Sequence, residues 1–118
     1  MTDCIFCKII KGEIPSERVY EGKTLIAIRD INPMKPTHVL FMPRDHVKDV
    51  LGLASWDHAP AFQAELNQAI AEVVAVEGIE NSGFSLITNC GSDGGQTVFH
   101  LHFHLMGGSP IEWAKLAQ

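Results

Sequence analysis

The chain has 118 residues, of which 46% are hydrophobic and only 19% charged, a composition typical of a packed globular protein. This length predicts a single domain over residues 1–118. The net charge of −5 disfavours binding along a nucleic-acid polymer, because the phosphate backbone requires a positive surface. A small phosphorylated ligand, held by backbone amides and histidines, is compatible with this charge.

The sequence also limits where the protein works. It contains no run of about 18 apolar residues, so we predict no membrane-spanning helix and no membrane partner. Its first residues lack a basic segment followed by an apolar one, so nothing indicates secretion. The cysteines number three, and an odd number favours reduced thiols over a disulfide framework. We therefore expect a cytoplasmic protein.

The first predicted elements are short. Apolar residues at helical spacing predict a short amphipathic helix over 4–11, ending at Gly12. Strands at 18–20 and 24–29 form a hairpin, and a loop with two prolines separates them from a strand at 38–42.

A long helix and two more strands complete the pattern. The helix is expected to begin near Ser55 and to end at Gly78. Its core-facing stripe consists of Phe62, Leu66, Ala69, Ile70 and Val73. Strands are expected at 84–88 and 99–106. Strands at both ends of the chain around one long helix predict an α+β fold, with an antiparallel sheet of about five strands and one long and one short helix.

Three histidines alternate with apolar residues near the C-terminus, at His100, His102 and His104. In a strand, alternate side chains share a face, with Cα atoms about 6.6 Å apart, so the three imidazoles would lie together. Polar surface decoration is the plain interpretation of this pattern. Metal binding or catalysis is the functional one.

A glycine-rich segment, 90–96, leads directly into this histidine run. Glycines allow positive φ and a close approach of the backbone, so consecutive amides can form an anion-binding concavity. An ordinary flexible hairpin loop is the alternative. Beside three imidazoles, the segment indicates a phosphoryl group held by amides and attacked by a histidine.

The chain resembles the histidine triad (HIT) family, whose motif is His-x-His-x-His-x-x with apolar x. Within that family it is similar to the Hint branch of purine nucleoside phosphoramidases. The similarity extends through 4–10, 29–33, 36–38, 89–96, 107–108 and Trp113. It implies a HIT-like fold, a purine nucleotide (AMP-like) substrate, and a homodimer in which each C-terminal tail reaches the partner's site.

The resemblance implies a role for each of four histidines. His102 would attack the α-phosphorus to give a nucleotidyl-histidine intermediate, and His104 would bind the phosphate and assist the leaving group. His100 together with His38 would form a proton relay behind the nucleophile. These roles suit imidazole, which titrates near pH ~6.5 and can be a neutral nucleophile or a proton donor.

The resemblance also implies a nucleotide-binding set. Asp30 would accept hydrogen bonds from the ribose hydroxyls, although a residue just after a strand can equally be a turn or cap residue. The base pocket would be lined by Ile5, Phe6, Ile9, Ile28 and Ile31. Core packing is the alternative for Ile9 and Ile28. The phosphate would be contacted by Asn89, Gly95, Gln96 and Thr97.

Cys4 and Cys7 form a Cys-x-x-Cys motif, a weak signal that suits either zinc or a redox pair. The short chain lacks the βαβ context of a thioredoxin-like protein, which disfavours the redox interpretation. Some bacterial HIT proteins hold a structural zinc through this motif and two distant histidines. Here the resemblance assigns those positions to His46 and His100, and it implies that catalysis requires no cofactor.

The resemblance therefore implies a hydrolase of purine nucleoside 5′-phosphoramidates, such as adenosine phosphoramidate or AMP-lysine. A hydrolase of dinucleoside polyphosphates or adenylyl sulfate with the same fold is one alternative. A zinc- or nucleotide-binding regulatory module with little turnover is another. A metal-dependent hydrolase with three histidine ligands is the least favoured, because it leaves the glycine-rich segment unexplained.

Overall fold

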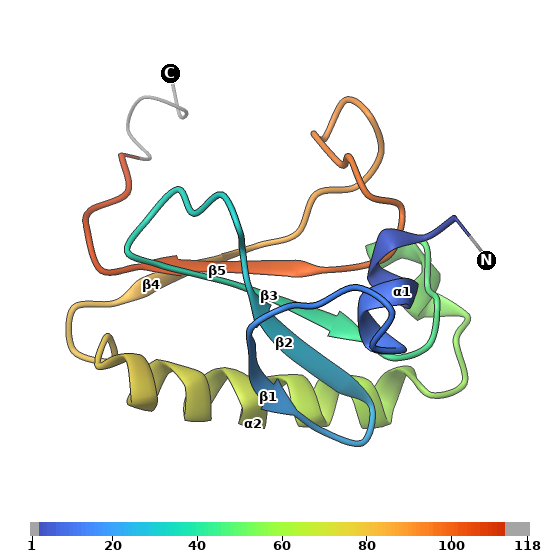
Figure 1. The fold of residues 1–118 in the computed structure, drawn as a ribbon, viewed down its shortest axis with the longest axis horizontal. Helices are drawn as coiled ribbons and strands as arrows, with labels where there is room; N and C mark the ends of the chain where they lie inside the picture. The colour runs from blue at the N-terminus through green and yellow to red at the C-terminus, as the bar shows by residue number, and fades with distance from the viewer. Residues whose placement is uncertain (1–2, 113–118) are drawn as a thin grey trace.

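The computed structural model describes residues 3–112 (Figure 1). Its elements in chain order are α1 (Ile5–Ile10), β1 (Arg18–Glu21), β2 (Leu25–Arg29), β3 (Thr37–Pro43), a 3-10 turn η1 (Val50–Ala54), α2 (Ala59–Glu77), β4 (Phe84–Ile87) and β5 (Phe103–Gly107). The strands form one sheet in the order β1-β2-β3-β5-β4, and every neighbouring pair is antiparallel. This confirms the predicted α+β fold. Trp113 and the tail that follows it lie outside the described residues.

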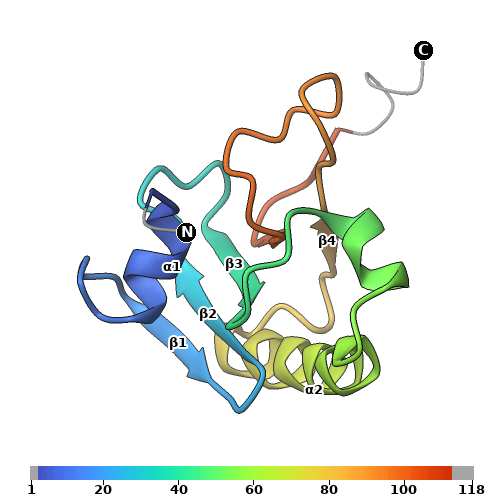
Figure 2. The ribbon, with the colours of Figure 1, turned by 90° about the vertical axis from the view of Figure 1, so that its right-hand side faces the viewer.

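Helix α2 covers one face of the sheet, and α1 lies on the other (Figures 1 and 2). The central strand β3 is buried along its whole length and sends alternate side chains to the two sides. Val39 and Phe41 pack in the core cluster under α2, whereas Leu40 and Met42 pack in a second cluster with residues of α1. By the same alternation, His38 points to the α1 side.

The core-facing stripe predicted for α2 is confirmed. Phe62, Leu66, Ala69 and Val73 are buried, and Ile70 packs partly buried against them. The helix also ends as predicted, at Gly78, whose φ of 71° is the left-handed conformation that glycine adopts easily.

The predicted start of α2 near Ser55 was wrong. Residues Val50–Ala54 form the separate turn η1, and α2 begins only at Ala59. Asp49 caps η1 by accepting a hydrogen bond from the Gly52 amide, at 3.3 Å. Pro60 lies in the first turn of α2, where a missing N–H costs no helical hydrogen bond. Proline therefore favours a helix start at this position.

The strand predicted at 99–106 begins late, because β5 covers only Phe103–Gly107. The last residue of β3 is Pro43, which has no amide hydrogen to donate to a neighbouring strand. The Leu101 amide bonds to the Val47 carbonyl outside the sheet, at 2.6 Å. His100 and His102 therefore lie on an irregular segment just before the sheet.

No helix within residues 3–112 combines the length and the apolar character that crossing a bilayer demands.

Candidate active site and metal centre

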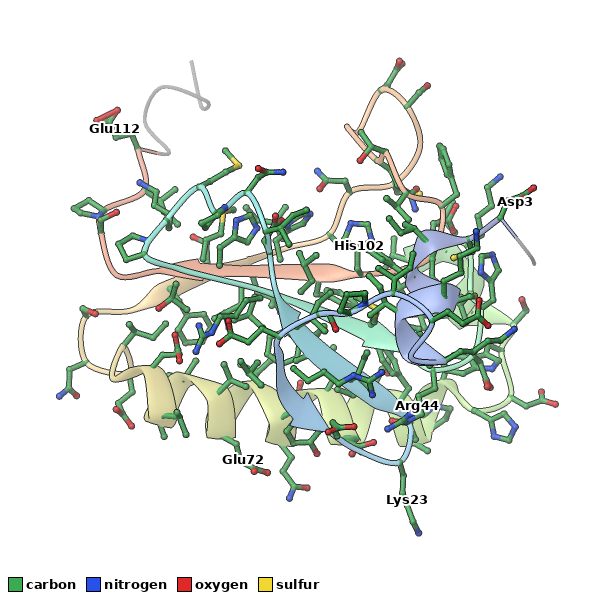
Figure 3. All side chains as sticks on the ribbon, viewed as in Figure 1. Asp3, Lys23, Arg44, Glu72, His102 and Glu112 are labelled. Carbon is green, nitrogen blue, oxygen red and sulfur yellow. The ribbon has the colours of Figure 1, made fainter. Side chains whose placement is uncertain are left out.

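Two neighbouring strands bring His38 and His104 together. His38 on β3 pairs with Met106, and Leu40 pairs with His104 on β5, so the two histidines are diagonal neighbours on the α1 side of the sheet. Nε2 of His38 lies 2.9 Å from Nδ1 of His104. The ring of His102 follows at 5.1 Å from that of His104, measured between centroids. His102 lies above the sheet, on the side away from α2 (Figure 3).

Main-chain groups determine which nitrogen of each ring carries its proton. The Met34 amide donates to Nδ1 of His38 at 3.1 Å, so the neutral His38 ring carries its proton on Nε2. That Nε2–H can only donate to Nδ1 of His104, which leaves His104 with its own proton on Nε2. The pair thus presents one outward N–H donor, at His104.

His102 has the opposite polarity, meaning that its ring proton is on Nδ1 and its lone pair on Nε2. Its Nδ1 lies 2.8 Å from the His100 carbonyl, which can only accept, so the ring proton is on Nδ1. Its Nε2 then carries a lone pair, the form of imidazole that acts as a nucleophile. Phe6 packs against this ring edge-on at 4.9 Å, and the side chain is buried.

Burial favours the neutral form of His38 and His104. Together with the neighbouring rings of His102 and His38, burial lowers the pKa of His104 to about 4. Burial also lowers the pKa of His38, against the opposing charge of Asp30, whose Oδ2 lies 3.5 Å from its Nε2. Neutral rings at neutral pH are what the hydrogen-bond directions require.

The structure pairs His38 differently from the relay that the resemblance implied. His38 contacts His104, whereas His100 turns its ring toward Cys4 and Cys7. The sheet register is the reason, because β3 ends at Pro43 and His100 lies beyond that end. Nε2 of His100 donates to the Pro43 carbonyl at 2.9 Å.

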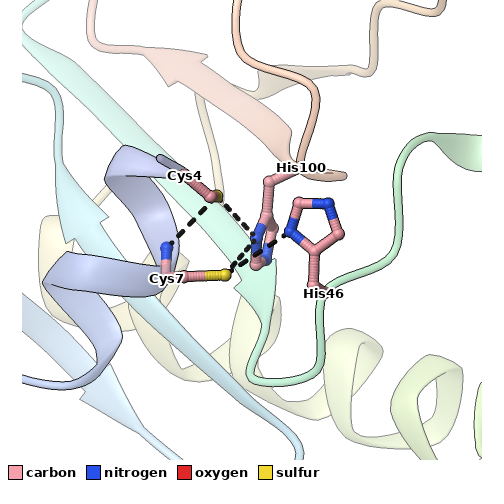
Figure 4. A group of neighbouring side chains, drawn as sticks. All are labelled: Cys4, Cys7, His46 and His100. Carbon is pink, nitrogen blue, oxygen red and sulfur yellow. Dashed lines mark hydrogen bonds between the residues drawn. The ribbon is translucent and has the colours of Figure 1, made fainter. Parts of the chain in front are cut away.

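The side chains of Cys4, Cys7, His46 and His100 converge between α1 and the loop after β3 (Figure 4). Their candidate ligand atoms all lie within 4.8 Å of one another. The Sγ–Nδ1 distances are 3.4 Å from Cys4 to His100, 3.6 Å from Cys7 to His100 and 3.4 Å from Cys7 to His46. A tetrahedral zinc with ordinary Zn–S and Zn–N bonds separates such atoms by about 3.5 Å. The four residues therefore fit zinc.

The surroundings of the cluster also suit a metal. The Pro43 carbonyl holds the proton of His100 on Nε2, so Nδ1 points its lone pair at the thiols. Cys4 Sγ accepts the Cys7 amide at 3.3 Å and so caps α1. Burial, together with the neighbouring Cys4, raises the pKa of the Cys7 thiol, so thiolate ligation here requires the charge of the cation to offset burial.

Hydrogen bonds from two side chains hold the glycine-rich segment in shape. The Gln96 side chain is buried; it accepts from the Gly91 amide at 2.9 Å and donates to the carbonyls of Lys48 and Val98. Asn89 donates to the Gly94 carbonyl at 2.8 Å. Gly95 has a φ of 87°, which a residue with a Cβ rarely adopts. Gln96 and Asn89 thus shape the loop that the resemblance assigns to phosphate.

The five apolar residues assigned to the base divide into two groups. Phe6, Ile9 and Ile28 are buried in the second core cluster, whereas Ile5 and Ile31 are 46% and 89% exposed. The packing interpretation therefore describes Ile9 and Ile28. Ile5 and Ile31 remain accessible to a ligand.

Asp30 and Thr97 lie in different surroundings, Asp30 beside His38 and Thr97 in a hollow beside Cys4 and His46. Oδ1 of Asp30 accepts from the Asn32 amide at 2.8 Å, the turn role that its position predicted, while Oδ2 faces His38. Thr97 lines a hollow of about 340 Å³ together with Asp3, Cys4, Ile5, His46, Val98 and Phe99.

Sequence reasoning missed the groups that orient the histidines. The Met34 amide and the Pro43 carbonyl are main-chain atoms, and any residue type supplies such atoms. No side-chain pattern could therefore have indicated them. The two prolines near Met34 indicated only a loop.

Comparison with known proteins defines the class. Residues 11–111 match the HIT domain family. The chain belongs to the HIT family, and the expectation of an enzyme of the histidine triad type is confirmed.

Individual relatives cover nearly the whole chain. Purine nucleoside phosphoramidase of Escherichia coli K12 is 40% identical over 109 residues, 92% of this chain and 90% of the relative. Protein HitA of Neisseria gonorrhoeae is 41% identical over 107 residues, covering 91% and 97%. A HIT family hydrolase structure from Clostridium thermocellum superposes with a TM-score of 0.87 at 44% identity, covering 94% of this chain and 95% of that one. The chain is thus similar to a phosphoramidase along its length.

Proposed function

We propose that the protein hydrolyses purine nucleoside 5′-phosphoramidates through a nucleotidyl-histidine intermediate at His102. The observation that carries the proposal is the pair of ring polarities: a lone pair on Nε2 of His102 beside an N–H on Nε2 of His104. A nucleophile and a proton donor are what breaking a P–N bond requires. The likeness to an E. coli purine nucleoside phosphoramidase supports the substrate class.

The chemistry follows in two displacements at phosphorus. Nε2 of His102 forms a bond to the α-phosphorus while the bond to the amine breaks. When substrate binds, its phosphate anion favours uptake of one proton from solvent by the His38–His104 pair, which becomes a cation. Nε2 of His104 then gives a proton to the departing amine, and the pair returns to its neutral form. Water then attacks the phosphorus, His102 leaves, and the His38–His104 pair takes back a proton.

The rest of the nucleotide is held by neighbouring residues. Asp30 accepts from the ribose hydroxyls through Oδ2, the oxygen that faces His38 and that the Asn32 amide does not occupy. Ile5, Phe6 and Ile31 contact the purine, backed by the buried Ile9 and Ile28. The backbone around Gly95 and the hydroxyl of Thr97 bind phosphate oxygens, with Asn89 and Gln96 bracing the loop.

We assign the Cys4, Cys7, His46 and His100 cluster to a structural zinc. Four protein ligands complete a tetrahedral set and leave no position for substrate, as in closed structural sites. When bound, zinc cross-links α1 to the loop after β3 and to the triad segment. The reaction itself requires no cofactor in this proposal.

We further propose that the protein is a cytoplasmic homodimer joined at β4. This strand is an edge of the sheet, with Phe84 and Leu86 41% and 42% exposed. Beside it, Ile70, Val74 and Phe84 line an apolar hollow of about 440 Å³ against α2. An exposed apolar edge strand favours pairing with another chain. Cys4, Cys7 and Cys90 form no disulfide, which suits a reducing compartment.

The test is hydrolysis of adenosine 5′-phosphoramidate by the wild type and by His102→Ala, with and without excess chelator. We expect turnover that the variant loses and the chelator spares, together with an adenylyl adduct on His102 in samples quenched with alkali. Turnover of a dinucleoside polyphosphate alone would overturn the proposed substrate. Turnover that survives in His102→Ala would overturn the intermediate.

A further inference from the structure

Helix α1 touches both the metal cluster and the nucleophile. Its N-cap Cys4 and its Cys7 place their sulfurs 3.4 and 3.6 Å from Nδ1 of His100. Between them in the chain, Phe6 packs its ring against His102 at 4.9 Å and against His100 at 5.9 Å. One helical turn therefore bridges the two centres.

The two ends of α1 are anchored by different groups. At the C-terminal end, Arg18 donates to the carbonyls of Ile9 and Ile10 at 2.7 and 3.1 Å, and Ile9 is buried in the second core cluster. At the N-terminal end, the polar contacts run through the sulfurs of Cys4 and Cys7. A helix of six residues is marginally stable alone, so its first turn depends on these thiols together with the buried ring of Phe6.

His100 provides a second connection. Its imidazole faces the two thiols, while its carbonyl accepts the ring proton of His102 at 2.8 Å. The residue is fully buried, so its side chain and its carbonyl move as one packed unit. Whatever fixes the His100 ring also fixes the hydrogen bond that keeps the lone pair of His102 on Nε2.

We propose that a thiophilic divalent cation at Cys4, Cys7, His46 and His100 and a nucleotide at the histidine triad bind cooperatively through α1. The cation fixes the first turn of α1 and with it Phe6, the side chain that orients His102 and borders the nucleotide. Phe6 and His100 are thus positioning residues. Since linkage is reciprocal, each ligand tightens the other by the same factor. This inference rests on the proposed nucleotide site and adds a coupling between that site and the metal.

Calorimetric titration of AMP into the zinc-loaded and the chelator-stripped full-length protein measures one side of the coupling. We expect AMP to bind about tenfold more tightly to the zinc-loaded form, within the usual range of couplings between sites. Equal affinities for the two forms would overturn the coupling while leaving the proposed function intact. No AMP binding to either form would overturn both.

The effect of AMP on the affinity for zinc is measured on the folded, zinc-loaded protein. This test is therefore valid even where the stripped form unfolds. A colorimetric chelator competes for zinc with and without saturating AMP, and we expect AMP to raise the zinc affinity by about the same factor, tenfold. An unchanged zinc affinity would contradict the proposal.

Two variants locate the coupling in the first turn of α1. Phe6→Leu keeps all four ligands but loses the ring contact with His102, so the ratio of zinc affinities with and without AMP falls toward one. Ile10→Ala, at the other end of the same helix, is the matched control and keeps the wild-type ratio. A full ratio in Phe6→Leu would overturn the role of this side chain.

Discussion

At the scale of single residues, His38, His102 and His104 each have one ring nitrogen held by a defined partner. The Met34 amide and the His100 carbonyl impose opposite polarities on His38 and His102. The hydrogen bond from Nε2 of His38 to Nδ1 of His104 then places the ring proton of His104 on Nε2. In the proposed reaction, a lone pair and an N–H donor would thus be in place before substrate binds, which would reduce reorganisation during the chemical step.

Replacing His38 tests this chain of hydrogen bonds. In His38→Ala nothing fixes the ring proton of His104 on Nε2, so we expect kcat for adenosine 5′-phosphoramidate to fall by about 10²-fold, with a smaller change in KM. Steady-state kinetics checks this expectation. His58→Ala is the control, because His58 lies at the start of α2 and makes no side-chain cap hydrogen bond. A variant that raises KM alone would show that His38 only assists binding.

The pKa of His104 has a consequence for stability. Its pKa is about 4 in the folded protein and near 6.5 when unfolded, so between these values the unfolded chain binds a proton that the folded chain does not. The free energy of unfolding therefore falls as pH drops from about 6.5 to about 4. In His104→Asn this decline becomes shallower. Urea denaturation of both proteins across this pH range tests the prediction, and parallel curves would contradict it.

At the scale of elements, Glu65 fastens the β1–β2 hairpin to α2. Its carboxylate accepts hydrogen bonds from the Tyr20 hydroxyl, the Lys23 amide, and both the amide and the hydroxyl of Thr24. Burial alone would raise its pKa, but these donors outweigh burial and hold the pKa below the usual value. Gly22 lies so close that a Cβ there would overlap the Glu65 carboxylate. Glycine at position 22 therefore leaves the room beside the hairpin that the Glu65 carboxylate occupies.

Glu65→Gln tests the fastening. The new amide turns an NH₂ group toward donors, so we expect the free energy of unfolding to fall by about 1–3 kcal/mol. Glu72→Gln, which removes a similar charge from the exposed side of the same helix, provides the control (Figure 3). Chemical denaturation measures the free energy of unfolding of both variants. An equal loss of stability in the two would mean that the removed charge, and not the lost hydrogen bonds, causes the loss.

At the scale of the whole molecule, the two faces of the sheet have separate tasks. The α2 face holds the larger core cluster, and the α1 face carries the histidines and the thiols. The edge at β4 leaves Phe84 and Leu86 partly exposed. In the proposed dimer, a second copy of the chain would cover this edge.

Phe84→Asp examines this edge. A charge in the apolar hollow against α2 opposes burial by a partner chain, so we expect the variant to be monomeric. Light scattering after size-exclusion chromatography measures the mass of the wild type and the variant. Lys23→Asp, on the hairpin loop at the opposite end of the strand order, is a control that should leave the mass of the wild-type assembly unchanged. A monomeric wild type would refute the dimer.

Much of the fold was predictable because its signals are local. The apolar stripe of α2 and the stop at Gly78 follow from helical spacing and from the conformational freedom of glycine. The starts of α2 and β5 were not predicted correctly. The capped turn η1 and the proline at the end of β3 override the propensity of the flanking residues.

The sequence by itself determined the family, the α+β class and the residue types of the site, since spacing and motif depend only on the order of residues. Only the tertiary structure decided that His38 pairs with His104, and that His100 turns toward Cys4 and Cys7. Those contacts join positions 66 to 96 residues apart. Sheet register and main-chain hydrogen bonds set them, and neither leaves a mark in side-chain composition.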